Sequence, residues 1–204
     1  MSDVNMWQIE QAYFDKGISC ICGVDEAGRG PLAGPVCAAA VILPPNAQIP
    51  GLNDSKKLSD KKRRELMPII QETAIAYAIA MVDHDKIDEI NILQATLLAM
   101  EQAIAGLKVR PELALIDGNR EKDFGVPAVT VVHGDSLSAS IAAASVLAKV
   151  TRDDLMTQMA SQYPGYGFEI HKGYGTKLHY QALEQLGPCK IHRMTFLKKL
   201  YGTK

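Results

Sequence analysis

This chain of 204 residues lacks several features that would restrict its class. No apolar run approaches the ~18 residues that a membrane-spanning helix needs. The four cysteines fit neither paired zinc ligands nor a disulfide-rich scaffold. The first 16 residues contain three acids and no apolar core of a signal peptide. These absences predict a cytoplasmic protein with reduced cysteines, of which Cys20, Cys22 and Cys37 lie in apolar runs and act as small buried side chains.

The chain also carries little net charge, formally −1, but its charges are unevenly placed. From His171 to the end, seven basic residues stand against Glu184 alone. A second group of six basic residues lies between residues 52 and 66, partly offset by three acids. Residues 61–64 of that group fit a solvated helix face equally well. The positive excess of the last segment is typical of a surface that binds a polyanion.

Strand-like and helix-like segments alternate along the chain, and 47% of its residues are hydrophobic. A chain of this length buries about 70% of its unfolded surface, which predicts one domain over residues 1–204, with a basic helical part from about residue 171. Strands are expected at 18–24, 36–43, 75–82, 113–116 and 128–132. Helices are expected at 62–73, 86–107, 138–163, 177–186 and 196–200, with Ser59 as a cap and Pro68 causing a kink or a late start. An ordered loop is expected at 165–175. This order predicts an α/β fold whose mixed central sheet is flanked by helices.

Four acids stand where the predicted strands end. Asp25 and Glu26 follow the first apolar run, Asp117 the fourth strand and Asp135 the fifth. Because the ends of adjacent strands converge in α/β sheets, we expect these carboxylates to lie together. Taken singly, Asp117 could be a turn residue and Asp135 a helix cap.

Carboxylates that converge need cations, since two of them ~4 Å apart repel by about 4 kcal/mol at an effective dielectric near 20. No histidine or cysteine cluster accompanies these acids in the sequence, which favours Mg²⁺ or Mn²⁺ over Zn²⁺. Carboxylates that hold two such ions often build a phosphodiester-cleaving site. The residues therefore predict metal-dependent phosphoryl chemistry. Successive strand side chains point to opposite faces, so we expect Glu26 to act differently from Asp25: through its main-chain carbonyl, in an outer shell, or after the end of the strand.

Six sequence blocks resemble those of ribonuclease HII, the bacterial type 2 ribonuclease H. The first and longest is GVDEAGRGPLAGPV at residues 23–36. The others are NDSKKL at 53–58, IDGN at 116–119, GDS at 134–136, ASVLAKVTRD at 144–153 and HKGYGT at 171–176. Any one block alone is weak, but their number and order cover almost the whole chain.

The resemblance implies a ribonuclease H-like fold and a metal-dependent endonuclease. Such an enzyme hydrolyses the RNA strand of RNA–DNA hybrids. It also nicks DNA duplexes on the 5′ side of embedded ribonucleotides, leaving 3′-hydroxyl and 5′-phosphate ends. Implied with it are Mg²⁺ or Mn²⁺, two ions when substrate is bound, and a monomer with nucleic acid rather than membrane as its partner. The N-terminal substrate-binding extension of some relatives and a clamp-binding tail are not evident.

The resemblance also assigns roles to residues. The catalytic and metal-binding acids of the family correspond to Asp25, Glu26, Asp117 and Asp135. Its glycine-arginine-glycine motif, where main-chain groups meet the ribose 2′-hydroxyl, corresponds to Gly28, Arg29 and Gly30. Its substrate tyrosine corresponds to Tyr174. We also expect Lys56 to contact a phosphate, although it could be an ordinary loop lysine.

Two other classes of protein remain as alternatives. A catalytically inactive hybrid-binding module would keep the groove but would gain nothing from four acids facing phosphates. A nucleotide-binding protein could use residues 28–30 as a phosphate cradle, but this motif is too short for a Walker loop and lacks its Lys-Ser/Thr ending.

Overall fold

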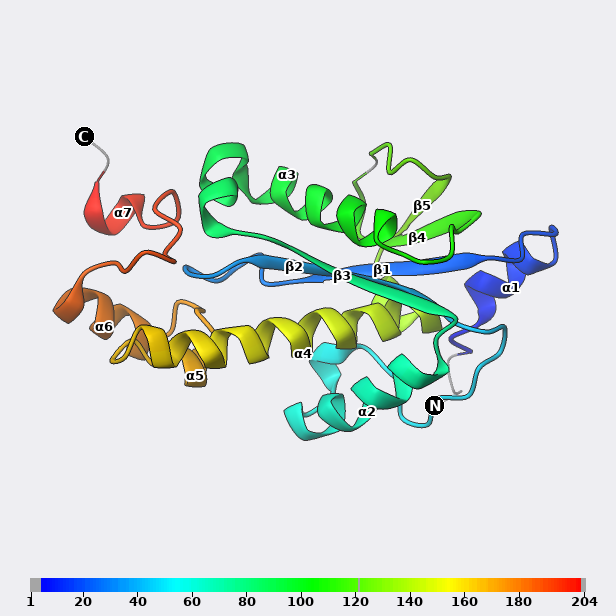
Figure 1. Ribbon diagram of the computed structural model, residues 1–204, viewed down its shortest axis with the longest axis horizontal. Helices are drawn as coiled ribbons and strands as arrows, with labels where there is room; N and C mark the ends of the chain where they lie inside the picture. The colour runs from blue at the N-terminus through cyan, green and yellow to red at the C-terminus, as the bar shows by residue number, and fades with distance from the viewer. Residues whose placement is uncertain (1–4, 121, 203–204) are drawn as a thin grey trace.

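The computed structural model describes residues 5–120 and 122–202. A five-stranded sheet with the order β3-β2-β1-β4-β5 forms its centre (Figure 1). The strands are β1 (Ile21–Ala27), β2 (Val36–Ile42), β3 (Ala76–Val82), β4 (Leu113–Asp117) and β5 (Ala128–Val131). The α-helices are α1 (Gln8–Phe14), α2 (Asp60–Thr73), α3 (His84–Ala105), α4 (Ala139–Gln162), α5 (Phe168–His171), α6 (Lys177–Leu186) and α7 (Lys198–Tyr201). Two 3₁₀ turns are η1 (Ser55–Lys57) and η2 (Gly134–Ser136).

The sheet is mixed, as predicted. β1 pairs with β2, and β2 with β3, in antiparallel fashion. β1 and β4, and β4 and β5, run parallel. Val24 is paired with Ile116, so the residues that follow them, Asp25 and Asp117, come out at the same edge of the sheet.

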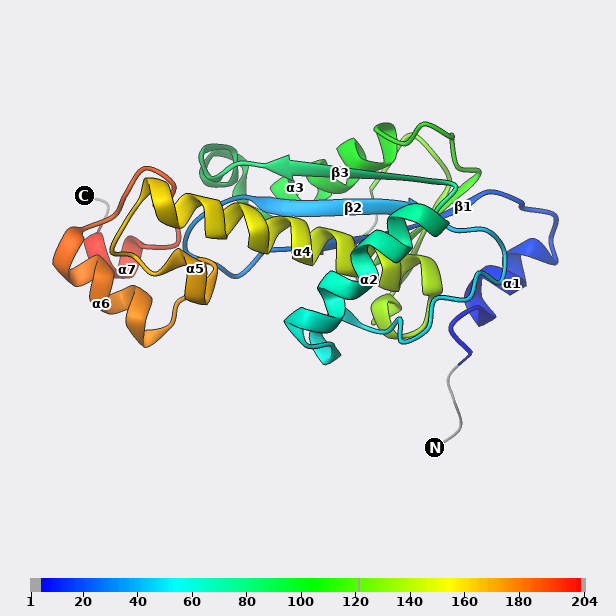
Figure 2. The ribbon, with the colours of Figure 1, turned by 60° about the horizontal axis from the view of Figure 1, so that its bottom comes forward.

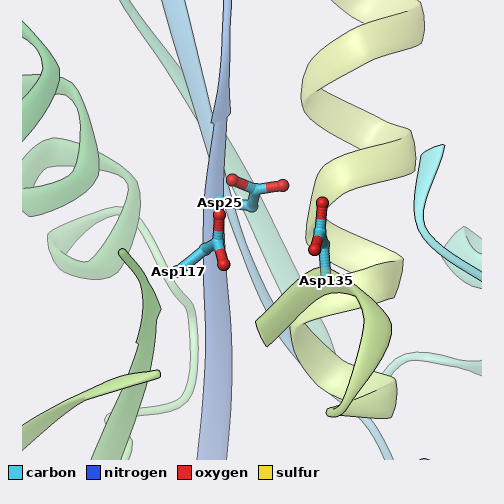
Figure 3. A group of neighbouring side chains, drawn as sticks. All are labelled: Asp25, Asp117 and Asp135. Atoms are coloured by element: carbon cyan, nitrogen blue, oxygen red, sulfur yellow. The ribbon is translucent and has the colours of Figure 1, made fainter. Parts of the chain in front are cut away.

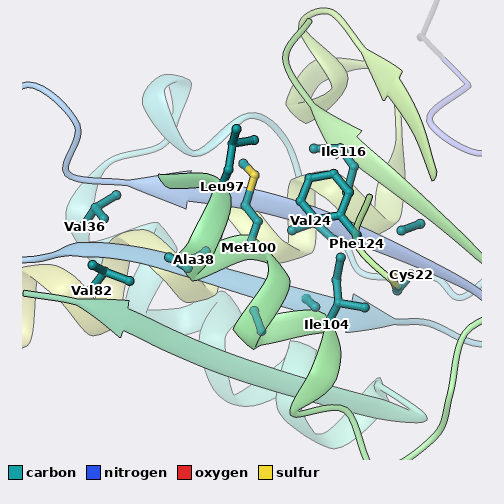
Figure 4. Packing of buried hydrophobic residues seen from close by; sticks show 14 of the residues in the cluster. Cys22, Val24, Val36, Ala38, Val82, Leu97, Met100, Ile104, Ile116 and Phe124 are labelled. Atoms are coloured by element: carbon teal, nitrogen blue, oxygen red, sulfur yellow. The ribbon is translucent and has the colours of Figure 1, made fainter. Parts of the chain in front are cut away.

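Helices cover both faces of the sheet, with α3 on one side and α4 and α2 on the other (Figures 1 and 2). Cys22 and Val24 of β1 face α3, where they pack with Met100 and Ile116 in the larger apolar core (Figure 4). Gly23 faces α4. A Cβ at Gly23 would lie 2.1 Å from the Ser140 carbonyl carbon, so only glycine lets α4 approach β1 this closely.

The C-terminal helices α5, α6 and α7 gather at the end of α4 that lies away from α1, in both views of the ribbon (Figures 1 and 2). Their apolar core joins Phe168 and Leu183 to Met156 of α4 and to Leu32. The segment after β1 is thereby packed against the C-terminal part of the chain. A main-chain hydrogen bond from Leu32 to the Gly173 carbonyl (2.8 Å) fastens the two together.

Several boundaries differ from the sequence predictions. β1 begins three residues later than expected and includes both acids. α2 begins at Asp60, capped by Ser59 as expected, and continues past Pro68, so a late start is wrong. α3 is kinked at Asn91 (φ 68°, ψ 164°), whose Oδ1 accepts from Leu93 N (3.0 Å) and so caps the second part of the helix.

Two short helices lie where the sequence predicts none. Helix α1 precedes the first strand, and the expected loop at 165–175 contains the single turn α5.

All four cysteines are free thiols, and burial in the core is confirmed for Cys22 and Cys37, while Cys20 is only half-buried. No helix within residues 5–120 and 122–202 is both long and apolar enough to span a bilayer.

Candidate active site

Three aspartates from distant parts of the chain meet at the edge of the sheet. Asp25 belongs to β1, Asp117 ends β4, and Asp135 lies in η2 just before α4 (Figure 3). One carboxylate oxygen from each lies within 4.8 Å of the others. Within the described ranges, this aspartate cluster is the only such group of potential metal ligands. The expected convergence of these three side chains is confirmed.

Local geometry fixes the turn that carries Asp135. His133 adopts a left-handed conformation (φ 57°), and Gly134 donates its N–H to Asp117 Oδ1 (2.7 Å). A Cβ at Gly134 would lie 2.5 Å from Ile141 Cδ1 and 3.3 Å from Asp117 Oδ1, so a larger residue would have to displace these side chains. The hydrogen bond from Gly134 N to Asp117 holds η2, and with it Asp135, next to Asp117.

A buried acid of α1 also stabilises the region around η2, the turn that carries Asp135. Glu10 is fully buried, and its Oε1 accepts from Ser138 Oγ (2.6 Å) and Ser140 N (3.0 Å). Ser138 in turn caps α4 by accepting from Ile141 N (3.2 Å). A carboxylate at the start of a helix is stabilised by the free N–H groups there. The unexpected helix α1 therefore contributes to the position of Asp135.

Burial and mutual repulsion disfavour the ionised form of the aspartate cluster. Asp25 is 3% exposed, and its pKa is raised well above the usual range, first by burial and then by the charges of Glu26 and Asp117. The pKa of Asp117 is raised by burial and by the charge of Asp135. Such shifts mean that the fully ionised cluster is unfavourable without a cation. Three oxygen donors, with no nitrogen or sulfur ligand among them, fit a hard divalent ion.

Lys56 supplies one positive charge to the cluster. Its Nζ lies 3.0 Å from Asp135 Oδ2, and its side chain is still 76% exposed. Burial alone would lower the pKa of Lys56, but the hydrogen bond and charge of Asp135, together with the charges of Asp25 and Asp54, outweigh this effect and raise it. Asp54 caps η1 by accepting from Lys56 N (2.8 Å) and so holds the lysine at this place. The expected phosphate contact of Lys56 stays a prediction.

Glu26 points to the other face of β1. Its Oε1 lies 3.4 Å from Arg29 Nη1, and it lines a pocket of about 170 Å³ together with Thr96, Asp117 and Asn119. Burial raises the pKa of Glu26, while the charge of Arg29 opposes the rise. The strand does not end at Glu26, and its carboxylate is not part of the aspartate cluster. Its expected role as a metal ligand stays a prediction.

The glycine loop (residues 28–30) lies beside Tyr174. A Cβ at Gly30 would be 3.8 Å from Tyr174 Cε1, and Gly28 has a positive φ of 93°. Tyr174 is 39% exposed. The structure thus brings together the two elements that the sequence associates with a ribose.

Sequence reasoning missed two neighbours of Tyr174. Lys149 Nζ lies 5.6 Å, and the Arg152 guanidinium 5.9 Å, from the centre of its ring. Both residues lie in the ASVLAKVTRD block, three positions apart on α4, so helical spacing could have placed them on one face. Asp153 pairs with Lys149 (2.8 Å).

A mixed sheet with three aspartates at its edge, next to a glycine loop and a basic C-terminal part, defines a metal-dependent nuclease of the ribonuclease H-like class. A sequence model of the family "Ribonuclease HII" matches residues 22–199. The chain therefore belongs to the ribonuclease HII family, whose members cleave the RNA of RNA–DNA hybrids and depend on metal ions. It is an endoribonuclease, and the inactive hybrid-binding alternative finds no support.

Individual relatives agree with this assignment. Ribonuclease HII of Endomicrobium trichonymphae is 56% identical over 193 residues, covering 94% of this chain and 92% of the relative. Ribonuclease HII of Caldicellulosiruptor bescii is 52% identical over 198 residues, or 97% of this chain and 96% of the relative. Among solved structures, ribonuclease H2 of Pyrococcus horikoshii OT3 is 26% identical with a TM-score of 0.70, covering 86% of this chain and 93% of that one.

Proposed function

We propose that this enzyme, besides cutting hybrids, nicks DNA duplexes on the 5′ side of an embedded ribonucleotide and leaves 3′-hydroxyl and 5′-phosphate ends. The observation that carries the proposal is the convergence of Asp25, Asp117 and Asp135, with one oxygen of each inside 4.8 Å. The glycine loop and Tyr174 beside it supply the elements to recognise a single ribose.

The aspartate cluster suits Mg²⁺ or Mn²⁺, because both prefer oxygen ligands. Two such ions, held by Asp25, Asp117 and Asp135 with Glu26 as the fourth acid, would supply an activated water and stabilise the leaving oxygen. Asp25 is held in place by Glu26 N, which donates to its Oδ1 (2.7 Å). Gly134 N does the same for Asp117. These main-chain bonds orient both carboxylates before any ligand arrives.

Recognition of the ribose is assigned to the glycine loop and Tyr174. The 2′-hydroxyl distinguishes RNA from DNA, and it both donates and accepts hydrogen bonds. Gly28 and Gly30 have no Cβ, so their main chain can approach the sugar closely. The Tyr174 ring would lie against the neighbouring sugar with its hydroxyl towards the 2′-oxygen. Arg29 would help through a phosphate or by ordering the loop.

Phosphate contacts are assigned to Lys56 and to the basic segment from residue 171 onward. Lys56 is the better placed of the two, since its exposed side chain already reaches the aspartate cluster. We further propose that the enzyme acts as a monomer in the cytoplasm, where its free thiols would stay reduced. Sedimentation of the purified chain and fractionation of cells would check these two points.

The decisive experiment uses a labelled DNA duplex that contains one ribonucleotide. With Mg²⁺ or Mn²⁺ the enzyme should produce a single nick 5′ to the ribonucleotide. The cut end should carry a 3′-hydroxyl, which is checked by whether a DNA ligase can use it. An all-DNA duplex of the same sequence is the control. Cleavage of the hybrid without any nick in the single-ribonucleotide duplex would contradict the proposal.

A further inference from the structure

Arg193, between α6 and α7, is fully buried, and its side-chain hydrogen bonds all go to main-chain oxygens, while its guanidinium also lies 5.2 Å from the centre of the Phe196 ring. Nη2 donates to the Gly28 carbonyl (2.6 Å), Nη1 to that of Arg29 (2.9 Å) and Nε to that of Gly34 (2.9 Å). No carboxylate within residues 5–120 and 122–202 forms an ion pair with it. A buried cation is costly, so hydrogen bonds to these carbonyls, together with the charge of Asp88, must offset much of its desolvation.

These bonds dictate the direction of two peptide groups. No peptide bond among the described residues is cis, and in a trans peptide the N–H points opposite to the C=O. Because the carbonyls of Gly28 and Arg29 turn inward to Arg193, the N–H groups of Arg29 and Gly30 turn outward. Neither N–H donates to any protein acceptor within the described ranges. Arg29 and Gly30 are exposed, so the two donors are free for a ligand.

The buried charge also strengthens these donors. A cation that polarises a carbonyl withdraws electrons from the same peptide and makes its N–H a better donor. Burial, followed by the charge of Arg152, lowers the pKa of Arg193 to about 9, so the guanidinium stays charged at neutral pH. An apolar side chain would fill the space without aiming or polarising the loop.

We propose that Arg193 is a positioning residue for ribose recognition: it aims the N–H groups of Arg29 and Gly30 at the 2′-oxygen of the substrate. The inference deepens the proposed function and depends on it, because it assumes that the glycine loop meets the ribose. It assigns the specificity of an exposed loop to a buried side chain more than 160 positions away in the sequence.

The test compares Arg193→Lys with the stability control Leu113→Ala. Leu113 is buried at the start of β4, the end of that strand opposite Asp117, so its loss leaves a cavity away from the glycine loop. Arg193→Lys keeps the charge and loses the fork of donors. Both variants should lose stability in urea, so stability alone does not separate a positioning role from a structural one.

The deciding measurement is the affinity for two duplexes that differ in one sugar, ribose or deoxyribose, with Ca²⁺ in place of Mg²⁺. Two misdirected hydrogen bonds should reduce the preference for the ribose about ten-fold in Arg193→Lys. Leu113→Ala should keep the wild-type preference. If Arg193→Lys does not fold, Arg193→Gln, which keeps an amide donor without the charge, is measured in the same way and should show the same loss.

An unchanged preference in the Arg193 variant would overturn the inference, and so would an equal loss in both variants. These outcomes differ from a failure of the proposed function. In that case the wild-type enzyme would itself not distinguish the two duplexes, whatever stands at position 193.

Discussion

Two clusters of ionisable side chains in this protein differ in how far the protein itself supplies partners for their polar atoms. In the aspartate cluster, three carboxylates share one small volume, the pKa values of Asp25 and Asp117 are raised by burial and by neighbouring negative charges, and Lys56 is a nearby cation. In the histidine cluster (His171, His179 and His192), every ring nitrogen has a hydrogen-bond partner within the protein.

The side chains of the histidine cluster form a chain of hydrogen bonds, and burial lowers the pKa of both His179 and His192. In one set of tautomers, His192 Nδ1 accepts from Cys189 N (2.9 Å), and His192 Nε2 carries the proton and donates it to His179 Nε2 (3.0 Å). His179 then carries its own proton on Nδ1 and donates it to the Tyr174 carbonyl (3.0 Å). This set of tautomers satisfies the whole chain of bonds.

The third ring fits the same scheme. His171 accepts from Gly173 N (3.1 Å) at Nδ1 and donates from Nε2 to the Tyr166 carbonyl (2.8 Å), and it stacks on His179 at 4.4 Å between ring centres. The direct contact of His179 with His192 leaves no space for an ion between them. The buried polar cluster with complete internal partners thus stabilises the fold, whereas the cluster with unbalanced charge is suited to bind a ligand.

The largest expected effect comes from removing one charge of the aspartate cluster. Asp117→Asn should lower cleavage roughly a hundred-fold or more, the usual size when a charge-stabilising group leaves an active site. Without metal the same variant should be more stable than wild type, because burial and the charge of Asp135 both disfavour ionised Asp117. Each ~1 kcal/mol gained would raise the melting temperature by about 2–4 °C.

Mg²⁺ should reverse this order of stability, since an ion that binds only the folded state stabilises the wild type more. Glu72→Gln removes one exposed acid from α2 and is the matched control, with no effect expected on either quantity. Near-normal cleavage by Asp117→Asn, or a loss of stability in EDTA, would remove the distinction between the two clusters.

The contribution of the histidine cluster to the stability of the fold should depend on pH, whereas that of the aspartate cluster should depend on metal. The pKa of His192 is lowered from 6.5 to about 4, first by burial and then by the charges of His179 and His171, against a hydrogen bond to Cys189. When the pKa of a base is lower in the folded protein than in the unfolded chain, the base contributes stability that is fully present above the pKa of the unfolded chain. That stability is lost as the pH falls from 6.5 towards 4.

Between pH 7 and pH 5 this loss amounts to about 2 kcal/mol for one such group. Urea unfolding of wild type and His192→Gln at the two pH values isolates it, because the raised pKa values of Asp25 and Asp117 act in both proteins alike and in the opposite direction. A wild-type protein with the same pH response as His192→Gln would show that His192 is not held neutral.

Tyr174 lies between the histidine cluster and the proposed ribose site, since its carbonyl is 3.0 Å from His179 Nδ1 and its ring is beside Gly30 of the glycine loop. Tyr174→Ala should reduce cleavage of a single-ribonucleotide duplex about ten-fold, the value of one lost hydrogen bond with its packing. Cleavage of an all-RNA strand paired with DNA should fall less, because further riboses remain available. Tyr77→Ala on β3 is the control, since Tyr77 is exposed to the same 39%. Equal rates for wild type and Tyr174→Ala on the first substrate would contradict this role.

The aspartate cluster could be predicted from the sequence, but the histidine cluster could not. Asp25 and Asp117 follow apolar runs, and the parallel order of adjacent strands is enough to bring such strand ends together. His171, His179 and His192 lie on three different segments without metal-ligand spacing, and they meet only because α5, α6 and the following loop fold over α4.

Long-range packing also explains the other misses. Helix α1 is short and shows no strong apolar period; it is fixed by tertiary contacts such as that of Glu10 with Ser138. The inward turn of the glycine loop depends on Arg193, which no local pattern relates to residues 28–30.

The smallest expected effect concerns Lys56, which belongs to the aspartate cluster by contact and to the substrate by our proposal. If its ammonium exchanges Asp135 for a phosphate when the duplex binds, Lys56→Ala should flatten the slope of log affinity against log salt by roughly 0.9. Lys57→Ala is the matched control: it is the next residue, is also exposed and contacts only Asp54 (3.9 Å) among the acids within reach in the described ranges. If Lys56 serves the cluster alone, the slope stays at its wild-type value in both variants. Loss of this counter-ion should then leave the carboxylates more negative and tighten Mg²⁺ binding, which calorimetry without nucleic acid measures directly.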